Sequence, residues 1–149
     1  VTGVQTCALP IFPLYTMRTI TVLATKLRAL SVARRLFDQW WQAPNINTGL
    51  VLAYRADMEA KIGDPKLAIL GYDRASTLFY RKHESASLFY AIRAAEMQMK
   101  SGQLQAAKRR LERTRINFPA NRIYQERIDT AFRKLNEHYE KRRRSESEP

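Results

Sequence analysis

Hydrophobic residues recur at intervals of three and four along most of the chain, in runs separated by turn residues. This spacing places side chains on one face of a helix. No stretch shows the alternation of apolar and polar residues that is typical of a strand. The pattern predicts an all-α fold with helices at residues 15–27, 30–42, 48–62, 65–81, 85–101, 104–117 and 121–143.

The helical runs contain an internal repeat. In three segments an alanine is followed four residues later by a large apolar residue. The third position of the pattern lies three residues further on. The three sets are Ala33/Phe37/Trp40, Ala68/Tyr72/Ala75 and Ala107/Leu111/Thr114. Twelve residues before each alanine stands a further small residue: Thr21, Ala56 and Ala95. Antiparallel helices approach closely only where side chains are small, so each small pair predicts a helix crossing. The alanines are 35 and 39 residues apart (68 − 33 and 107 − 68).

Turn residues separate the helices within each repeat. Gly63 and Gly102 both lie five residues before the repeat alanine, and they predict left-handed turns. Arg28 stands at the same place in the first repeat. Asp64 and Pro65 are typical of a helix start, and Pro119 is expected to end the last repeat.

These small residues, turn glycines and terminal proline resemble the pattern of the tetratricopeptide-repeat (TPR) family. The resemblance covers nearly all of residues 12–144. It implies antiparallel helix pairs stacked as a short right-handed solenoid, with repeats at about 15–45, 48–83 and 85–119. The charged helix at 121–143 would cap the array, and one apolar stripe on it is expected to hold Ile123, Ile128, Phe132, Leu135 and Tyr139. Leu52 and Ala91 stand where the family has tryptophan, and 145–149 is expected to be a disordered tail.

The first eleven residues, VTGVQTCALPI, resemble a translated sequencing-library adapter. We therefore expect residues 1–11 to be non-native and the natural protein to extend upstream. The only cysteine, Cys7, falls in this segment, so no disulfide is expected within the chain.

The formal net charge of +12 is compatible with nucleic acid, anionic lipid or an acidic protein as partner. No nucleic-acid motif accompanies it, and we favour an ordinary solvated surface. Basic residues gather toward the C-terminus, with a run at 141–144. Four aromatic residues lie beside Arg81, Lys82 and Arg93: Phe79, Tyr80, Phe89 and Tyr90. They suggest either the stacking of nucleic-acid bases or packing between repeats, and we favour packing.

The sequence offers little for catalysis. His83 and His138 lie far apart and lack metal-ligand spacing, and there is no phosphate-binding loop or nucleophile elbow. Residues 1–17 hold the longest charge-free stretch, which is too short and too interrupted to span a bilayer. The expected protein is therefore a binding scaffold without enzyme activity, cofactor, metal or transmembrane segment.

In the TPR family, the first helix of each pair lines a concave groove that binds a peptide or a partner helix. The resemblance assigns nine residues to that groove: Arg18, Val22, Ala53, Asp57, Ala60, Phe89, Ile92, Glu96 and Met99. A carboxylate clamp known in the family is not expected. Arg18 and Arg93 suit such a clamp, but Val22, Tyr54 and Phe89 have the wrong chemistry.

Three alternatives stay open. NFPANRIYQERI resembles a repeat-ending phrase of bacterial outer-membrane assembly lipoproteins, which are similar arrays. The positive charge leaves an RNA-binding helical repeat, and the chain could be the regulatory tail of a larger enzyme encoded upstream. Partner identity and compartment, bacterial cytoplasm or periplasm, are also open.

Overall fold

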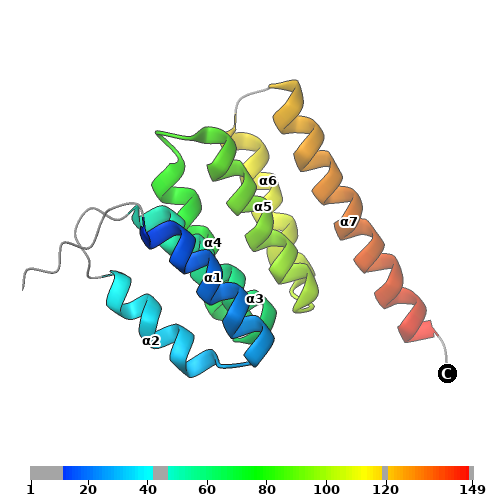
Figure 1. Cartoon of the computed structure of the whole chain (residues 1–149). Coiled ribbons are helices and arrows are strands. Elements are labelled where there is room, and N and C mark those ends of the chain that lie inside the picture. The colour runs from blue at the N-terminus through cyan, green and yellow to red at the C-terminus, as the bar shows by residue number, and fades with distance from the viewer. Residues whose placement is uncertain (1–11, 42–46, 119–120, 148–149) are drawn as a thin grey trace, which may run out of the picture.

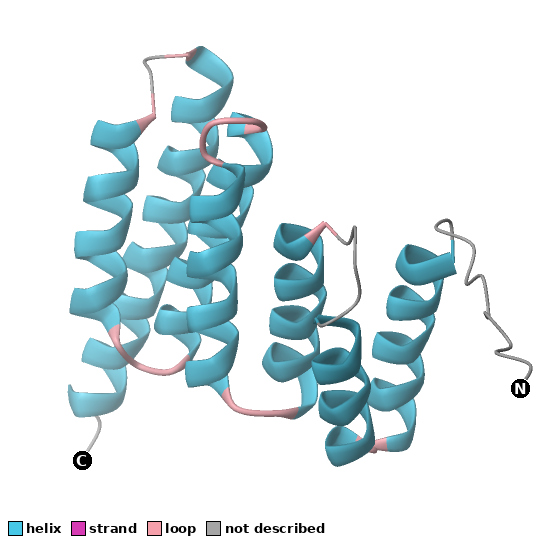
Figure 2. Cartoon of the chain, turned by 90° about the vertical axis from the view of Figure 1, so that its left-hand side faces the viewer, coloured by secondary structure: helices cyan, strands magenta, loops and turns pink. Residues whose placement is uncertain are grey.

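The computed structural model describes residues 12–41, 47–118 and 121–147, and within these ranges the chain consists of α-helices joined by turns and short loops (Figures 1 and 2). The prediction of an all-α fold is confirmed. The described helices are α1 (Phe12–Leu27), α2 (Leu30–Trp41), α3 (Thr48–Ile62), α4 (Pro65–Phe79), α5 (Glu84–Lys100), α6 (Leu104–Asn117) and α7 (Arg122–Ser147).

The helix boundaries follow the predicted ones to within one residue, except at the start of α1 and at the ends of α4 and α7. α1 begins at Phe12 and not at residue 15. α4 ends at Phe79, and Tyr80–His83 form the connection to α5. α7 continues through residues 145–147, which we expected to be disordered, because an ion pair between Arg142 and Glu146 at 2.8 Å spans its last turns. The adapter-like segment 1–11, Pro119 and residues 148–149 lie outside the described residues.

The helices pack mainly on their neighbours in sequence. Each of α1 to α6 contacts the helix that follows it, and α1 also contacts α3, as α5 contacts α7. Figure 2 shows the helix axes lying roughly along one direction. The chain is thus an array in which contacts are made between successive helices.

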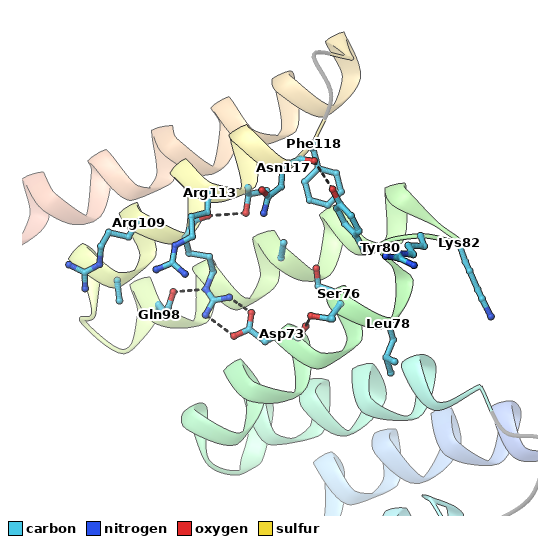
Figure 3. A pocket seen from close by; sticks show the side chains of 16 residues that line it. Asp73, Ser76, Leu78, Tyr80, Lys82, Gln98, Arg109, Arg113, Asn117 and Phe118 are labelled. Atoms are coloured by element: carbon cyan, nitrogen blue, oxygen red, sulfur yellow. Dashed lines mark hydrogen bonds and ion pairs between the residues drawn. The ribbon is translucent and has the colours of Figure 1, made fainter.

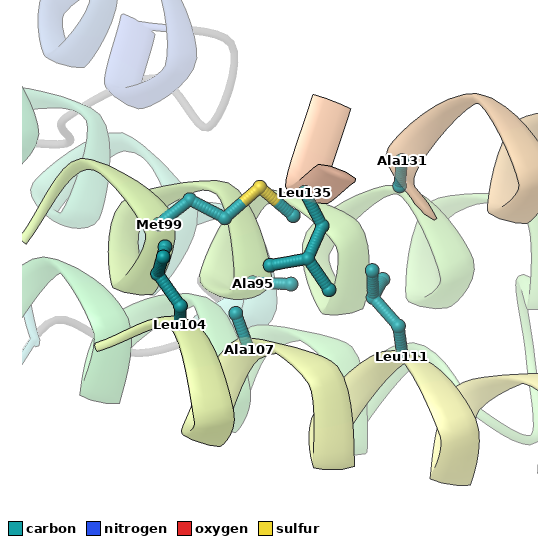
Figure 4. Packing of buried hydrophobic residues seen from close by; sticks show 7 residues of the cluster. All are labelled: Ala95, Met99, Leu104, Ala107, Leu111, Ala131 and Leu135. Atoms are coloured by element: carbon teal, nitrogen blue, oxygen red, sulfur yellow. The ribbon is translucent and has the colours of Figure 1, made fainter. Parts of the chain in front are cut away.

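The small residues of the repeat lie at buried crossings, as the sequence predicts. Ala33, Ala68 and Ala107 are buried, and so are the large residues four positions later. Ala56 and Ala68 share one core cluster. Ala95 and Ala107 share another, in which Leu111, Ala131 and Leu135 bring α6 and α7 together (Figure 4). The repeat alanines are thus buried in all three segments, and in the second and third segments the two small residues share a cluster.

A further close approach, which the repeat pattern does not mark, occurs at Gly71 on α4. A Cβ atom added there would lie 2.8 Å from the Cβ of Ala56 on α3. Only glycine fits this distance without displacing one of the two helices. The crossing of α3 and α4 therefore depends on two adjacent small positions, Ala68 and Gly71.

Two helix ends adopt the left-handed conformation that the sequence predicts for a turn glycine. Gly102 has φ +74°, and Arg28 has φ +51°. In both turns the next residue donates a backbone hydrogen bond five residues back, from Gln103 N–H to the Gln98 carbonyl at 2.8 Å and from Ala29 N–H to the Ala24 carbonyl at 3.2 Å. This bond is typical of a Schellman helix end.

Gly63 differs, and the expectation of a left-handed turn there is wrong. Its φ is −121°. A Cβ atom at Gly63 would lie 2.0 Å from the carboxylate of Glu59. That carboxylate accepts the backbone N–H of Asp64 at 3.0 Å and so occupies the space beside the glycine. Gly63 is required by this close contact and not by its backbone angles.

Replacing Arg28 by glycine is expected to stabilise the protein by about 0.5–1 kcal/mol, because a non-glycine residue is strained in the left-handed region. Urea unfolding of the two chains measures this difference. Lys26→Gly, two residues earlier inside α1, is the matched control and is expected to destabilise by about 1 kcal/mol. A loss of stability in Arg28→Gly similar to that of the control would contradict the left-handed turn.

Candidate functional site

A groove runs between α5 and α7. It encloses a cavity of about 560 Å³, and two exposed apolar side chains, Phe89 on α5 and Ile123 on α7, contribute to its wall. Their exposed fractions are 50% and 59%. The remaining lining residues are Ile92, Arg93, Glu96, Glu126, Arg127 and Thr130. The groove is therefore apolar in part and bordered by charges of both signs.

Helical spacing explains why these side chains reach the groove. α5 buries Leu88, Ala91 and Ala95, which leaves Phe89 and Glu96 on the less covered side of the helix. α7 buries Ile128, Ala131 and Leu135. Ile123 precedes Ile128 by five residues and so falls outside the buried stripe. It lies in the first turn of α7, where the side chain of Asn121 accepts the Ile123 N–H at 2.9 Å.

The two walls of the groove are held together by packing and by polar contacts. Leu88 and Ile128 share a core cluster with Phe118. Arg127 on α7 donates to the Ser85 hydroxyl at 3.4 Å near the start of α5. Eleven residues along α5 from Ser85, Glu96 pairs with Lys134 at 2.6 Å. These contacts place the starts of both helices together and fix α5 and α7 parallel.

A polar network continues from the groove toward α3 and α4. The buried Tyr72 donates its hydroxyl proton to Asp57 at 2.5 Å. Arg93 lies 3.3 Å from the same hydroxyl and 3.4 Å from both Asp57 and Glu96. Its guanidinium also lies over the Tyr72 ring, 5.5 Å from the centroid. Arg93 therefore connects the groove to the two preceding helices.

The electrostatics of this network favour a protonated phenol beside a charged guanidinium. Burial, and then the nearby Asp57, raise the pKa of Tyr72 well above its ordinary value. Burial alone would lower the pKa of Arg93, but Tyr72, Asp57 and Glu96 together raise it. Tyr72 therefore remains a hydrogen-bond donor, and Arg93 remains a cation, throughout the neutral range.

Three of the predicted groove residues, Phe89, Ile92 and Glu96, line this cavity together. Asp57 joins them through Arg93, and Ala60 is half-buried on α3. Val22 is exposed on α1 and does not line the groove. The side chain of Arg18 lies outside the described residues.

Two predicted groove residues are corrected. Ala53 and Met99 are only 2% and 3% exposed, so neither offers a surface to a ligand. Met99 packs in the core between α5, α6 and α7, because α7 covers the end of α5 where an uncapped array would leave it open. The α7 wall was missed, since the sequence assigned this helix only a capping role. The expectation that Ile123 lies on the apolar stripe of this helix is wrong: it is 59% exposed, because the five residues to the buried Ile128 turn a helix by about 140°.

The aromatic cluster at the α4–α5 junction serves mainly packing. Phe79 is buried and stacks on Tyr90 with 5.7 Å between ring centroids. Tyr80 packs edge-on against Phe118 at 5.7 Å, and its hydroxyl donates to the Asn117 carbonyl at 3.1 Å. Phe89 contacts Tyr90 edge-on at 5.2 Å and remains half exposed. Packing is thus the role of Phe79 and Tyr90, while Phe89 faces the groove.

A second and larger cavity, of about 820 Å³, lies between α4, α5 and α6 (Figure 3). It shares no lining residue with the α5–α7 groove. Within residues 12–41, 47–118 and 121–147, no cluster of three or more histidine, cysteine or acidic side chains is arranged to hold a metal ion. No helix in the same ranges is both long and apolar enough to cross a membrane.

Comparison of the chain with models of protein families, with curated proteins and with solved structures finds no significant match.

Proposed function

We propose that the chain is an interaction scaffold of the tetratricopeptide type that binds a peptide or a partner helix in the groove between α5 and α7. In this proposal α1–α2, α3–α4 and α5–α6 are helix pairs stacked as a short right-handed solenoid, and α7 caps it. The observation that carries the proposal is the groove itself, where residues assigned from the repeat pattern, Phe89, Ile92 and Glu96, line one cavity.

Several contacts at a nearly constant sequence separation support the repeat. Asp73 on α4 is bound by Arg110 on α6, and Tyr80 is bound to Asn117, and both pairs are 37 residues apart. Asp57 and Arg93 are 36 apart, and Glu96 and Lys134 are 38 apart. A repeating unit brings equivalent positions side by side at one repeat length. These separations lie between the alanine spacings of 35 and 39 residues.

The exposed apolar residues support a ligand with an apolar face. Phe89 and Ile123 lie on opposite walls, and burial of such side chains is the main source of affinity when a helix lies in a groove. The charged border of Arg93, Glu96 and Arg127 would set the orientation of the ligand more than its affinity. Binding is proposed here in place of catalysis, as the sequence indicates.

The test begins with peptides selected from a random display library against the full chain. Phe89→Ala and Ile123→Ala are each expected to weaken the selected peptides by about tenfold, since each removes roughly 1–2 kcal/mol of buried contact. Ile116→Ala is the matched control, because Ile116 on α6 is 81% exposed and lies outside the groove. Fluorescence anisotropy measures the three affinities, and an equal loss in the control would refute the groove.

Salt separates this proposal from the RNA-binding alternative. A peptide held by Phe89 and Ile92 buries apolar surface and should bind with little dependence on salt. RNA held by the basic run at 141–144 would lose about one log unit of affinity per log of salt for each phosphate contact. The alternative would be favoured if the chain formed a tight, salt-sensitive complex with RNA, if neutralising Lys141 to Arg144 abolished that complex, and if Phe89→Ala did not change its affinity.

A further inference from the structure

The larger cavity, between α4, α5 and α6, is strongly basic. Its lining includes five cationic side chains and a single carboxylate, that of Asp73. The charge of this carboxylate is already neutralised, because Arg110 donates hydrogen bonds to both of its oxygens. Arg110 is itself held by a hydrogen bond of 2.9 Å that it donates to the Gln98 side chain. Four of the cations have no acidic partner among the described residues: Arg81, Lys82, Arg109 and Arg113.

Arg109 and Arg113 are the central pair. They stand one turn apart on α6, so both side chains project from the same face of the helix. Within the part of the chain that the structure describes, neither side chain makes a hydrogen bond or an ion pair. Like charges at this spacing repel each other and destabilise a helix. The neighbouring Lys108, in contrast, has Glu112 at the same spacing, 3.9 Å away.

The rest of the lining is fixed and partly apolar. Tyr80 and Phe118 close one end of the cavity, and the Tyr80 ring is half exposed there (Figure 3). Leu78 lies at the edge of the cavity, and its side chain points away from Arg113 (Figure 3). Lys82 lies at the edge and extends outward (Figure 3). A ligand that fits would therefore bring negative charges one helical turn apart and an apolar surface for the Tyr80 ring.

We propose that this cavity is a second docking site, which takes an acidic amphipathic helix of a partner protein. Carboxylates one turn apart on the ligand would meet the guanidinium groups of Arg109 and Arg113 as charge-assisted hydrogen bonds. Apolar side chains of the ligand would lie on the half-exposed ring of Tyr80. RNA matches the charge and could stack a base on Tyr80, but the sequence carries no nucleic-acid motif, which favours the protein ligand.

This site is independent of the α5–α7 groove. It is built mainly on α4 and α6, the second helices of the proposed pairs, and uses different residues of α5. A scaffold with both sites could hold two segments of one partner, or two partners, at the same time. Failure of either proposal leaves the other standing.

The probe is a fluorescein-labelled synthetic peptide, helical and amphipathic, with glutamates one turn apart beside leucines. Its affinity for the full chain is measured by anisotropy at low and moderate salt. Arg109→Gln/Arg113→Gln is expected to weaken binding by about tenfold. The matched control is Lys141→Gln/Arg144→Gln, which removes the same charge from the exposed end of α7 and is expected to change affinity by less than about twofold. Phe89→Ala should leave this binding unchanged.

Two further readouts make the proposal falsifiable. Arg113→Gln alone is expected to keep or raise the Tm, because it relieves repulsion on α6, so loss of binding could not be ascribed to unfolding. Labelled oligouridine and a peptide with glutamine in place of glutamate are measured in parallel. The proposal would be overturned if Arg109→Gln/Arg113→Gln and the control variant lost affinity equally, or if the glutamine peptide bound as tightly as the acidic one. It would also be overturned if the acidic peptide did not bind measurably, or if oligouridine bound more tightly and its binding depended on Arg109 and Arg113.

Discussion

Replacing Arg34 by alanine is expected to lower the free energy of unfolding by about 3 kcal/mol at neutral pH. Arg34 on α2 binds both oxygens of Glu59 on α3, at 2.6 and 2.7 Å. Glu59 is only 1% exposed, and its remaining partner is the backbone N–H of Asp64. Without Arg34, a buried carboxylate keeps most of its desolvation cost and loses its counter-ion. Urea unfolding measures the change.

The pH dependence of this effect follows from the pKa of Glu59. Burial by itself would raise that pKa, but the hydrogen bonds from Arg34 and the Asp64 N–H hold it below the ordinary value of 4.5. The ion pair therefore stabilises the fold fully above about pH 4.5, and the contribution is lost as pH falls through the lower folded-state pKa. In the Arg34→Ala chain, burial determines the pKa of Glu59, so its carboxyl group takes up a proton more readily as the pH falls. The difference in the free energy of unfolding between the two chains should therefore become smaller in acid.

Arg35 provides the control for this prediction. It neighbours Arg34, is exposed, and has no acidic partner among the described residues. Arg35→Ala should therefore change stability by less than about 0.5 kcal/mol. Equal effects of the two substitutions, or a loss in Arg34→Ala that does not change with pH, would show that the ion pair with Glu59 contributes little.

Ala107→Leu is expected to destabilise the protein by about 1–3 kcal/mol through overpacking. Ala107 is fully buried between α5 and α6, in the cluster that also holds Leu111 and Leu135 (Figure 4). A leucine there has to push α5 away from α6. Gln105→Leu, at an exposed position of the same helix, is the control and should be nearly neutral because glutamine and leucine have similar helix propensities. A neutral Ala107→Leu would mean that the proposed crossing is wrong.

The positions of the helices could be predicted from sequence because each helix is specified locally. α3 and α6 begin and end at the predicted residues, where Asn47, Asp64 and the turn at Gly102 mark the boundaries. The end of α7 was less predictable. Its last turns depend on contacts one turn apart, such as Arg142 with Glu146, which a polar tail does not reveal.

The groove was predictable only in part, because it depends on how helices distant in sequence lie together. Phe89 and Glu96 could be assigned from the repeat pattern, since they share a face of one helix. Met99 shares that face in the sequence but is covered by α7. Ile123 on the opposite wall belongs to the helix that the pattern treats as a cap. Neither fact follows from residue spacing within one helix.

The basic cavity shows a similar limit. The net charge of +12 and the density of arginine in α6 are visible in the sequence. The sequence does not reveal which arginines are already paired. Arg110 is bound by Asp73, 37 residues earlier, whereas Arg109 beside it has no acidic partner within the described ranges. Only the position of Asp73 on α4 opposite Arg110 on α6 separates a structural arginine from one available to a ligand.

The most direct test of the central claim is to map where a selected peptide binds, by following backbone amide chemical shifts of the isotopically labelled full chain during a titration. The proposed groove predicts that the largest changes fall on α5 and α7, around Phe89, Ile92 and Ile123, and that they disappear in Phe89→Ala. Changes confined to the basic end of α7 at 141–144, or spread over helices that do not line the groove and unaffected by Phe89→Ala, would contradict it.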